Sequence, residues 1–115
     1  MNAIAYNIQA KEKELLVRAN AKRHQLTLIS NELNAETSAF SAGKEAVIVS
    51  EFDTLTATLL GYLKKQGVRK IITRSHSTQH IDQEAAKELQ IQICKLNENL
   101  SPEERAWQVI DLLSS

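Results

Sequence analysis

The feature that most constrains this sequence is the alternation of short apolar runs with longer amphipathic stretches. The apolar runs have the length of buried strands, and the stretches between them repeat their apolar residues at helical spacing. Strands that alternate with helices form parallel sheets covered by helices on both faces, because each crossover helix must return the chain to the starting edge. The expected strands are Ala3–Tyr6, Leu26–Ile29, Ala46–Val49, Ile71–Thr73 and Ile91–Leu96.

The composition of the strands predicts their order in the sheet. Ala3–Tyr6, Ala46–Val49 and Ile71–Thr73 are almost continuously apolar, as strands buried on both faces are. Gln25–Ser30 and Ile91–Leu96 include polar residues, which suits the two edges of a sheet. We therefore expect a single α/β domain over residues 1–115. It would be a flavodoxin-like three-layer sandwich with a five-stranded parallel sheet of order 2-1-3-4-5.

Capping residues locate the helices between these strands. Asp82 can accept hydrogen bonds from the free N–H groups of a first helical turn, and we assign the same role to Asp53. Ser101-Pro102 begins a capping box with proline at the first helical position. Gly67 provides a stop, and the polar segment Asn31–Lys44 has no clear assignment. The expected helices are Glu12–His24, Leu55–Lys65, Gln83–Leu89 and Ser101–Leu113.

The composition excludes several classes of partner. The chain has 115 residues, with 14 basic and 14 acidic side chains, so a net charge of zero gives no general attraction to nucleic acid or to an anionic membrane. No apolar run approaches the roughly 18 residues that a membrane-spanning helix needs. Cys94 is the single cysteine and leaves no internal disulfide, so we expect a cytoplasmic protein.

The three glycines exclude two devices that bind nucleotides. Gly43, Gly61 and Gly67 are at least six positions apart. A dinucleotide-binding turn needs glycines two and three apart, so that the backbone can approach a pyrophosphate, and a Walker A loop needs glycines five apart before a lysine. We therefore expect this chain to hold no cofactor by either device.

The carboxyl ends of the strands are where a ligand is expected in this kind of sheet. These ends are Asn7–Gln9, Ser50–Asp53, Arg74–His80 and Asn97–Leu100. A guanidinium at Arg74 can grip a carboxylate there, or it can have a structural role by pairing with Asp53 or Glu51, which we favour. The candidate substrate-binding residues are Arg74, Ser75, His76, Ser77, Thr78, Ser50, Glu51 and Phe52.

Other reactive side chains support no further site. His76 and His80 are four apart, but no neighbouring carboxylate or thiol completes a ligand set, so we expect no metal. Cys94 lies within an expected strand without a histidine partner and should be buried and unreactive. We assign no catalytic residue.

The stretch Gly67–Leu96 carries a resemblance to a known family. It reads GVRKIITRSHSTQHIDQEAAKELQIQICKL, in which a strand ends at Arg74, a cap lies at Ile81-Asp82, and a helix contains Ala85-Ala86-Lys87. A Ser101-Pro102 helix start follows. This order resembles the substrate domain of the D-isomer-specific 2-hydroxyacid dehydrogenases, the family of D-lactate and glycerate/formate dehydrogenases. The resemblance extends over nearly the whole chain and implies the substrate half of such an enzyme.

The departures from the family lie at positions that the resemblance assigns to chemistry. The family's catalytic Arg, Glu and His and its glycine-rich NAD site lie in a second domain, for which these 115 residues contain no counterpart. In the substrate half, the loop after the fourth strand presents glycine amides to the substrate carboxylate. Here Ser77 stands at the glycine position and His80 at an asparagine position. Side chains in that loop are expected to obstruct close approach to the backbone.

Two functions follow from these observations and remain open. The chain can be a stand-alone substrate domain without dehydrogenase activity of its own, acting as a small-ligand or protein-interaction module. Alternatively, it is half of a split NAD-dependent D-2-hydroxyacid dehydrogenase that a separate nucleotide-binding chain completes. A phosphoacceptor receiver domain shares this size and strand order, but Tyr6-Asn7-Ile8 lacks the acidic pair that would hold Mg²⁺.

The final helix predicts an interface between two copies of the chain. Ala106, Val109, Ile110 and Leu113 form one apolar stripe that should pack on the sheet. Trp107 and Leu112 flank that stripe and widen the apolar surface. In the resembled family this helix leads toward the second domain, so we expect a homodimer to cover the surface here.

Overall fold

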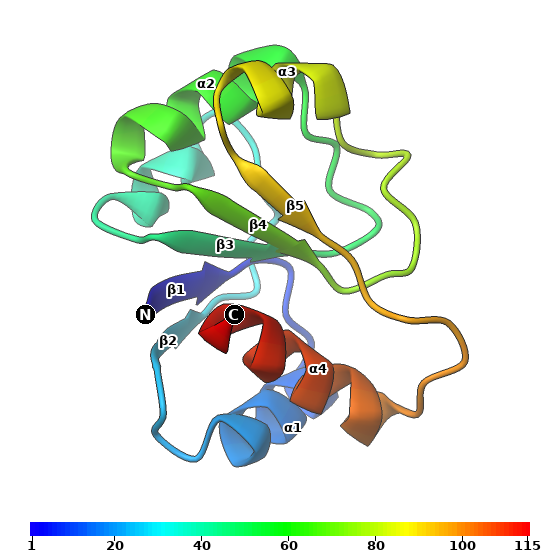
Figure 1. Cartoon of the computed structure of the whole chain (residues 1–115). Coiled ribbons are helices and arrows are strands. Elements are labelled where there is room, and N and C mark those ends of the chain that lie inside the picture. Colours follow the sequence, from blue (N-terminus) through cyan, green and yellow to red (C-terminus); the bar gives the residue numbers. More distant parts are fainter.

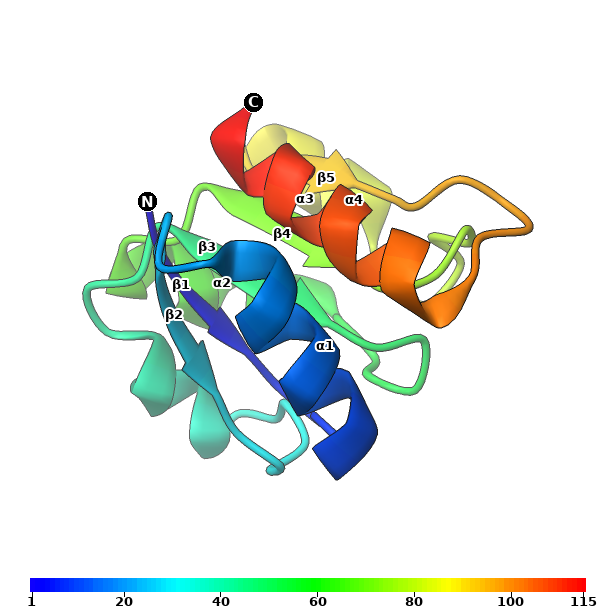
Figure 2. The ribbon, with the colours of Figure 1, turned by 90° about the horizontal axis from the view of Figure 1, so that it is seen from below.

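The computed structural model describes residues 1–115 as one parallel sheet between two layers of helices (Figure 1). The five strands are ordered β2-β1-β3-β4-β5, which confirms the predicted architecture. Helices α1 and α4 lie side by side on one face, and α2, α3 and the short 3₁₀ helix η1 cover the other (Figures 1 and 2). The elements are β1 Asn2–Ala5, α1 Ala10–Asn20, β2 Gln25–Leu28, η1 Thr37–Ser41, β3 Ala46–Val49, α2 Ala57–Gln66, β4 Lys70–Thr73, α3 Gln83–Glu88, β5 Gln92–Cys94 and α4 Pro102–Ser114.

The three central strands are buried on both faces. Val47 and Ile71 belong to the core under α2 and α3, whereas Ile48 and Ile72 belong to the core under α1 and α4. Successive residues of a strand point to opposite faces, so a strand covered on both sides must be apolar throughout. The edge strands β2 and β5 are only partly buried, as their mixed composition predicted.

Helix α1 ends earlier than the apolar periodicity indicates. The expected helix ran to His24, but α1 ends at Asn20, and Ala21 and Lys22 have left-handed φ angles of 45° and 63°. The Asn20 side chain accepts a hydrogen bond from the His24 N–H and donates to its carbonyl, both at 3.0 Å. This side-chain pairing closes a turn, and β2 starts directly after it.

The assignment of Asp53 as a helix cap is wrong. Helix α2 is capped by Thr56, whose hydroxyl accepts a hydrogen bond from the Leu59 N–H at 3.2 Å. Asp53 lies before this cap and is bonded to other loops, as described below. The Asp82 cap and the Ser101 capping box are both confirmed.

A buried tyrosine side chain helps to hold the polar segment Asn31–Lys44. Tyr6 is fully buried, and its hydroxyl lies 2.7 Å from the Thr37 carbonyl oxygen and 2.8 Å from Ser41 Oγ. Burial raises the pKa of this phenol above its ordinary value. Two contacts from one rigid ring fix η1 against the sheet.

Helix α4 packs on the sheet by the predicted stripe, since Ala106, Val109, Ile110 and Leu113 are all buried. Leu112 is half-buried against the same core. Trp107 is instead 67% exposed and does not belong to the core. None of the helices in the structure has the length and apolarity required to cross a membrane.

Candidate functional site

The carboxyl ends of the strands form one edge of the molecule and contain two distinct polar regions. The first, which we call the switch site, comprises the ends of β1 and β3. The strand that follows β1 in the chain lies on one side of it, and β3 lies on the other, so the strand order changes direction here. Ligands of open α/β sheets bind at such points. The second is the β4–α3 loop, residues Arg74–His80, with the segment that follows β5.

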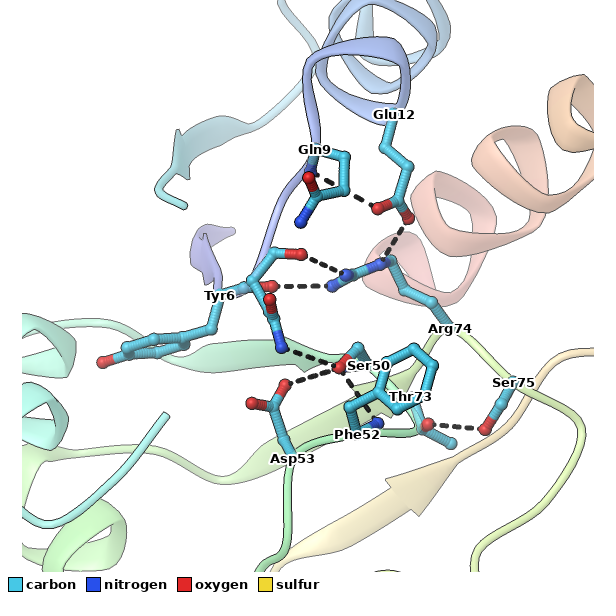
Figure 3. Close-up of polar contacts among 10 residues, drawn as sticks. Tyr6, Gln9, Glu12, Ser50, Phe52, Asp53, Thr73, Arg74 and Ser75 are labelled. Atoms are coloured by element: carbon cyan, nitrogen blue, oxygen red, sulfur yellow. Dashed lines mark hydrogen bonds and ion pairs between the residues drawn. The ribbon is translucent and has the colours of Figure 1, made fainter. Parts of the chain in front are cut away.

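The switch site is filled by the Arg74 side chain (Figure 3). Its guanidinium donates to the carbonyl oxygens of Tyr6 and Asn7 at 2.9 and 3.1 Å and to Glu12 Oε2 at 2.9 Å. The side chain is only 7% exposed. Arg74 therefore has the structural role that we favoured, but the expected pairing with Asp53 or Glu51 is wrong. The carbonyls at the end of β1 and a carboxylate in the first turn of α1 satisfy it instead.

Asp53 closes the other side of the switch site. This carboxylate is 2% exposed and accepts hydrogen bonds from the N–H groups of Leu33 and Ser50, at 3.1 and 2.8 Å, and from Ser50 Oγ at 3.1 Å. Ser50 Oγ in turn accepts from the Phe52 N–H and from Asn7 Nδ2 (Figure 3). No buried side-chain nitrogen or oxygen of the chain lacks a hydrogen-bond partner, and the bonds of Asp53 and Ser50 hold these loops together.

In the β4–α3 loop, a chain of hydrogen bonds connects the side chains of Ser75, Thr73 and His80. Ser75 Oγ donates to the Ser77 carbonyl at 2.9 Å, Thr73 Oγ1 lies 2.9 Å from Ser75 Oγ, and His80 Nε2 lies 3.0 Å from Thr73 Oγ1. Each hydroxyl has one proton, so Thr73 must donate to Ser75 and His80 must donate from Nε2. Burial lowers the pKa of His80, which agrees with a neutral imidazole in this position.

The remaining hydroxyls of the loop are also used internally. Ser77 Oγ accepts from the Gln79 N–H, and Thr78 Oγ1 accepts from Gln83 Nε2. By contrast, the backbone N–H groups of the four successive residues Ser75–Thr78 donate to no acceptor in the chain. A loop with serine at the glycine position thus still leaves its amides unpaired. The expected obstruction by side chains concerns how closely a ligand can approach this backbone, and it stays a prediction.

A hollow of about 240 Å³ adjoins this loop. Of the predicted site residues, Glu51, Arg74, Ser75 and His76 line it, whereas Ser50, Phe52, Ser77 and Thr78 do not. Asn97, Asn99, Leu100 and Arg105 complete its wall.

Arg105 is the residue of this hollow that the sequence did not identify. It lies in the first turns of α4, five positions after the predicted ligand-edge segment Asn97–Leu100, and the course of that helix along the sheet brings it to this edge. Its guanidinium takes part in none of the ion pairs or side-chain hydrogen bonds of the chain. It is exposed, so its charge is available to an anion.

Two further features concern the grouping of possible metal ligands and the single cysteine. No three side chains of the histidine, cysteine and carboxylate types lie close enough to hold a metal ion. Cys94 is 8% exposed, and burial raises the pKa of its thiol, which disfavours the reactive thiolate.

Comparisons with known proteins place this geometry among its relatives. The family model described as D-isomer specific 2-hydroxyacid dehydrogenase, catalytic domain, matches residues 2–103. Among solved structures, D-lactate dehydrogenase from Escherichia coli is 28% identical with a TM-score of 0.81, over 84% of this chain and 31% of that one. The Salmonella D-lactate dehydrogenase is 30% identical with a TM-score of 0.79, over 84% of this chain and 30% of that one.

A more distant neighbour supports the fold alone. D-2-hydroxyisocaproate dehydrogenase is 19% identical with a TM-score of 0.78, over 85% of this chain and 30% of that one. No curated protein matches the sequence. The chain therefore spans about 30% of the length of the solved structures that it resembles.

Proposed function

The chain belongs to the D-isomer specific 2-hydroxyacid dehydrogenase family through its catalytic domain, and on that premise we propose that it binds a small organic acid at the β4–α3 loop. The ligand class is a carboxylate with a neighbouring hydroxyl or keto oxygen. The chain holds this acid without transferring a hydride by its own residues. The enzyme activities of the similar structures are properties of chains about three times as long.

The observation that carries the proposal is the pair of unpaired amides at Ser75 and His76, which line the hollow together with the unpaired guanidinium of Arg105. Successive backbone N–H groups attract anions, and a guanidinium adds charge and a second pair of donors. The bonds among Thr73, Ser75 and His80 hold the loop in shape before a ligand arrives, so little ordering cost opposes binding. The hollow of about 240 Å³ suits a small acid.

The residues present do not fit the NAD that the family implies. A dinucleotide-binding turn brings glycine backbone against a pyrophosphate at the end of the first strand. Here that turn is Tyr6–Gln9, without glycine, and the Arg74 side chain occupies the space in front of its carbonyls. The groups at the end of the first strand are thus used within the fold and not for a pyrophosphate.

A split dehydrogenase is the alternative, and one observation favours it. Phe52 is 81% exposed at the carboxyl edge, near the hollow's Glu51. A large apolar side chain in that position would be covered by a nucleotide-binding chain seated over the edge. In that case the partner supplies both NAD and the catalytic groups.

Titration of the ¹⁵N-labelled chain with pyruvate and with D-lactate tests the proposal. We expect saturable shifts at the amides of Ser75–Thr78 with millimolar affinity, about −4 kcal/mol. Arg105→Gln should weaken binding by about tenfold, since it removes one charge-assisted contact. Lys64→Gln on α2, a matched loss of one positive charge far from the hollow, should change nothing.

The same samples decide between the two functions. Shifts confined to other regions, or none at all, overturn the proposed site. Turnover of D-lactate with NAD by this chain alone overturns the proposed lack of hydride transfer. Turnover that appears only after an NAD-binding chain is added establishes the split enzyme.

A further inference from the structure

The outer surface of α4 carries an exposed aromatic side chain with no partner in the fold. Trp107 is 67% exposed and lines a broad, open hollow of about 610 Å³. Leu100 and Gln108 contribute to the same hollow. An indole left in water over a concave surface is a common centre of protein interfaces. We call this surface, defined by Glu103, Trp107 and Asp111 with their neighbour Glu104, the Trp107 face.

The charges of the Trp107 face have one sign. Glu103 and Asp111 lie four residues before and after Trp107, so that all three form one row on the helix. Neither of these carboxylates takes part in an ion pair or side-chain hydrogen bond. The net charge of the whole chain is zero, so this concentration of negative charge is local.

The two other charged groups of the hollow are already engaged. Glu104 accepts a hydrogen bond from the Ser101 N–H at 2.9 Å, which lowers the pKa of this carboxyl and keeps it ionised. Arg18, the one cation there, pairs with Glu14 at 3.2 Å. The hollow around Trp107 therefore has three carboxylates against a single guanidinium, which leaves an excess of negative charge there.

We propose that the Trp107 face docks a segment of a partner protein that presents arginine side chains. A guanidinium stacks on an indole by cation–π attraction, for which Trp is the best aromatic partner. The planar guanidinium also forms paired hydrogen bonds with carboxylates, and here one lies on each side of the ring along the helix. The site thus offers three matched contacts to one basic segment.

A second copy of this chain fits the same surface poorly. Two α4 helices that pair about a two-fold axis at Trp107 bring Glu103 of one copy against Asp111 or Glu103 of the other, whichever way the helices run. Like charges placed opposite each other oppose association, so the homodimer expected from the sequence meets repulsion at its own centre. A basic partner removes that repulsion.

The docked segment would lie next to the proposed acid site without forming part of it. Asn97 and Leu100 line both the 610 Å³ hollow and the 240 Å³ hollow beside the β4–α3 loop. The inference rests on the charges and exposure of α4 and holds whether or not the chain binds an organic acid.

The fluorescence of Trp107, the single tryptophan of the chain, provides a direct readout. We expect the peptide GSRRSG to change this fluorescence saturably, the peptide GSQQSG to leave it unchanged, and added salt to weaken the effect. The double variant Glu103→Gln/Asp111→Asn should bind GSRRSG about fivefold more weakly, as the loss of two exposed charge contacts predicts. The matched double variant Glu84→Gln/Glu88→Gln on α3 should bind like the wild type.

Three outcomes overturn the proposal. They are the absence of a saturable change with GSRRSG, an equal loss of affinity in both double variants, and sedimentation of the wild type as a dimer that Trp107→Glu converts to a folded monomer. The last result would identify a second copy as the occupant. A monomeric wild type that binds GSRRSG at Trp107 supports the basic partner.

Discussion

Two regions of the same sheet edge each contain an arginine, and their contacts differ. At the switch site, Arg74 is 7% exposed and donates to two carbonyls and a carboxylate. At the β4–α3 loop, Arg105 is exposed and has no partner, and the four amides from Ser75 to Thr78 are unpaired as well. The polar groups around Arg74 are bonded to one another, whereas Arg105 and the loop amides have no partner within the chain.

The difference shows how to distinguish a charged side chain that stabilises the fold, such as Arg74, from one that can bind a ligand, such as Arg105. Position alone would favour the switch site, since ligands of this fold bind there. A polar group that already has buried partners, however, must give them up before it can hold a ligand, and the cost of leaving those partners unsatisfied exceeds the gain. Unpaired groups on a preorganised loop pay no such cost, which favours the β4–α3 loop.

The largest expected effect comes from removing the side chain that closes the switch site. Arg74→Ala leaves the carbonyls of Tyr6 and Asn7 without their donor and uncouples β4 from the start of α1. We expect a loss of about 3 kcal/mol in the free energy of unfolding, measured by urea denaturation. Arg105→Ala should change that free energy by less than about 0.5 kcal/mol.

This pair of variants tests the comparison in both directions. If Arg74→Ala unfolds at nearly the wild-type urea concentration, the switch site is not the structural element described here. If Arg105→Ala instead loses several kcal/mol, then Arg105 also belongs to the fold and its freedom to bind an acid is lost as an argument.

A smaller loss of stability is expected at Asp53. Asp53→Asn keeps the shape of the side chain but turns one of its two acceptors into a donor, which then faces either the Leu33 N–H or the Ser50 N–H. We expect a cost of about 2 kcal/mol in urea denaturation. The same chemical change at exposed Asp111, Asp111→Asn, is the control and should be close to neutral. Equal effects of the two substitutions would contradict a special role for Asp53.

The fold could be predicted from the sequence because burial controls it. Continuous apolar runs such as Ala46–Val49 lie where both faces of the sheet are covered, and the mixed strand at Gln25–Leu28 lies at an edge. Caps with a local mechanism, such as Ser101, were equally predictable. These signals act over a few residues and need no knowledge of what lies across the molecule.

The contacts of the site could not be predicted, because they join residues far apart in the chain. Arg74 and its partner Glu12 are 62 positions apart, and Asp53 bonds Leu33 across 20. Nothing local distinguishes a carboxylate that caps a helix from one that accepts hydrogen bonds from another loop. Arg105 reaches the hollow only because α4 returns along the sheet. The sequence predicted which edge of the sheet carries the candidate residues. Which of them are held in buried hydrogen bonds and which stay unpaired required the structure.

The hydrogen-bond chain beneath the β4–α3 loop provides the next test. Thr73→Val keeps the volume of a fully buried side chain but removes the oxygen that joins Ser75 to His80. We expect a loss of about 1 kcal/mol in urea denaturation and faster hydrogen exchange of the amides at Ser75–Thr78. Thr54→Val, at an exposed threonine two positions after Phe52, is the control. Unchanged exchange in Thr73→Val would show that the loop is ordered by other contacts.

The smallest expected effect concerns the protonation of His80. Burial lowers the pKa of this imidazole below the ordinary value of 6.5, although the nearby carboxylates of Asp53 and Glu51 act in the opposite direction. The unfolded chain therefore binds a proton more readily than the folded one. The stability that His80 contributes is complete above about pH 6.5 and is lost as the pH falls through the folded-state pKa.

His80→Gln isolates this contribution, because glutamine can donate to Thr73 Oγ1 but does not titrate. We expect the wild type to lose stability relative to His80→Gln as the pH falls below about 6.5, with a constant difference above it. The comparison matters because burial also lowers the pKa of His24, and this second acid-sensitive group acts equally in both proteins. NMR titration of the imidazole should give a pKa for His80 below 6.5, with the proton on Nε2 in the neutral form. A pKa above 6.5 would contradict the burial of this imidazole, and a proton on Nδ1 in the neutral form would contradict the hydrogen-bond chain through Thr73 and Ser75.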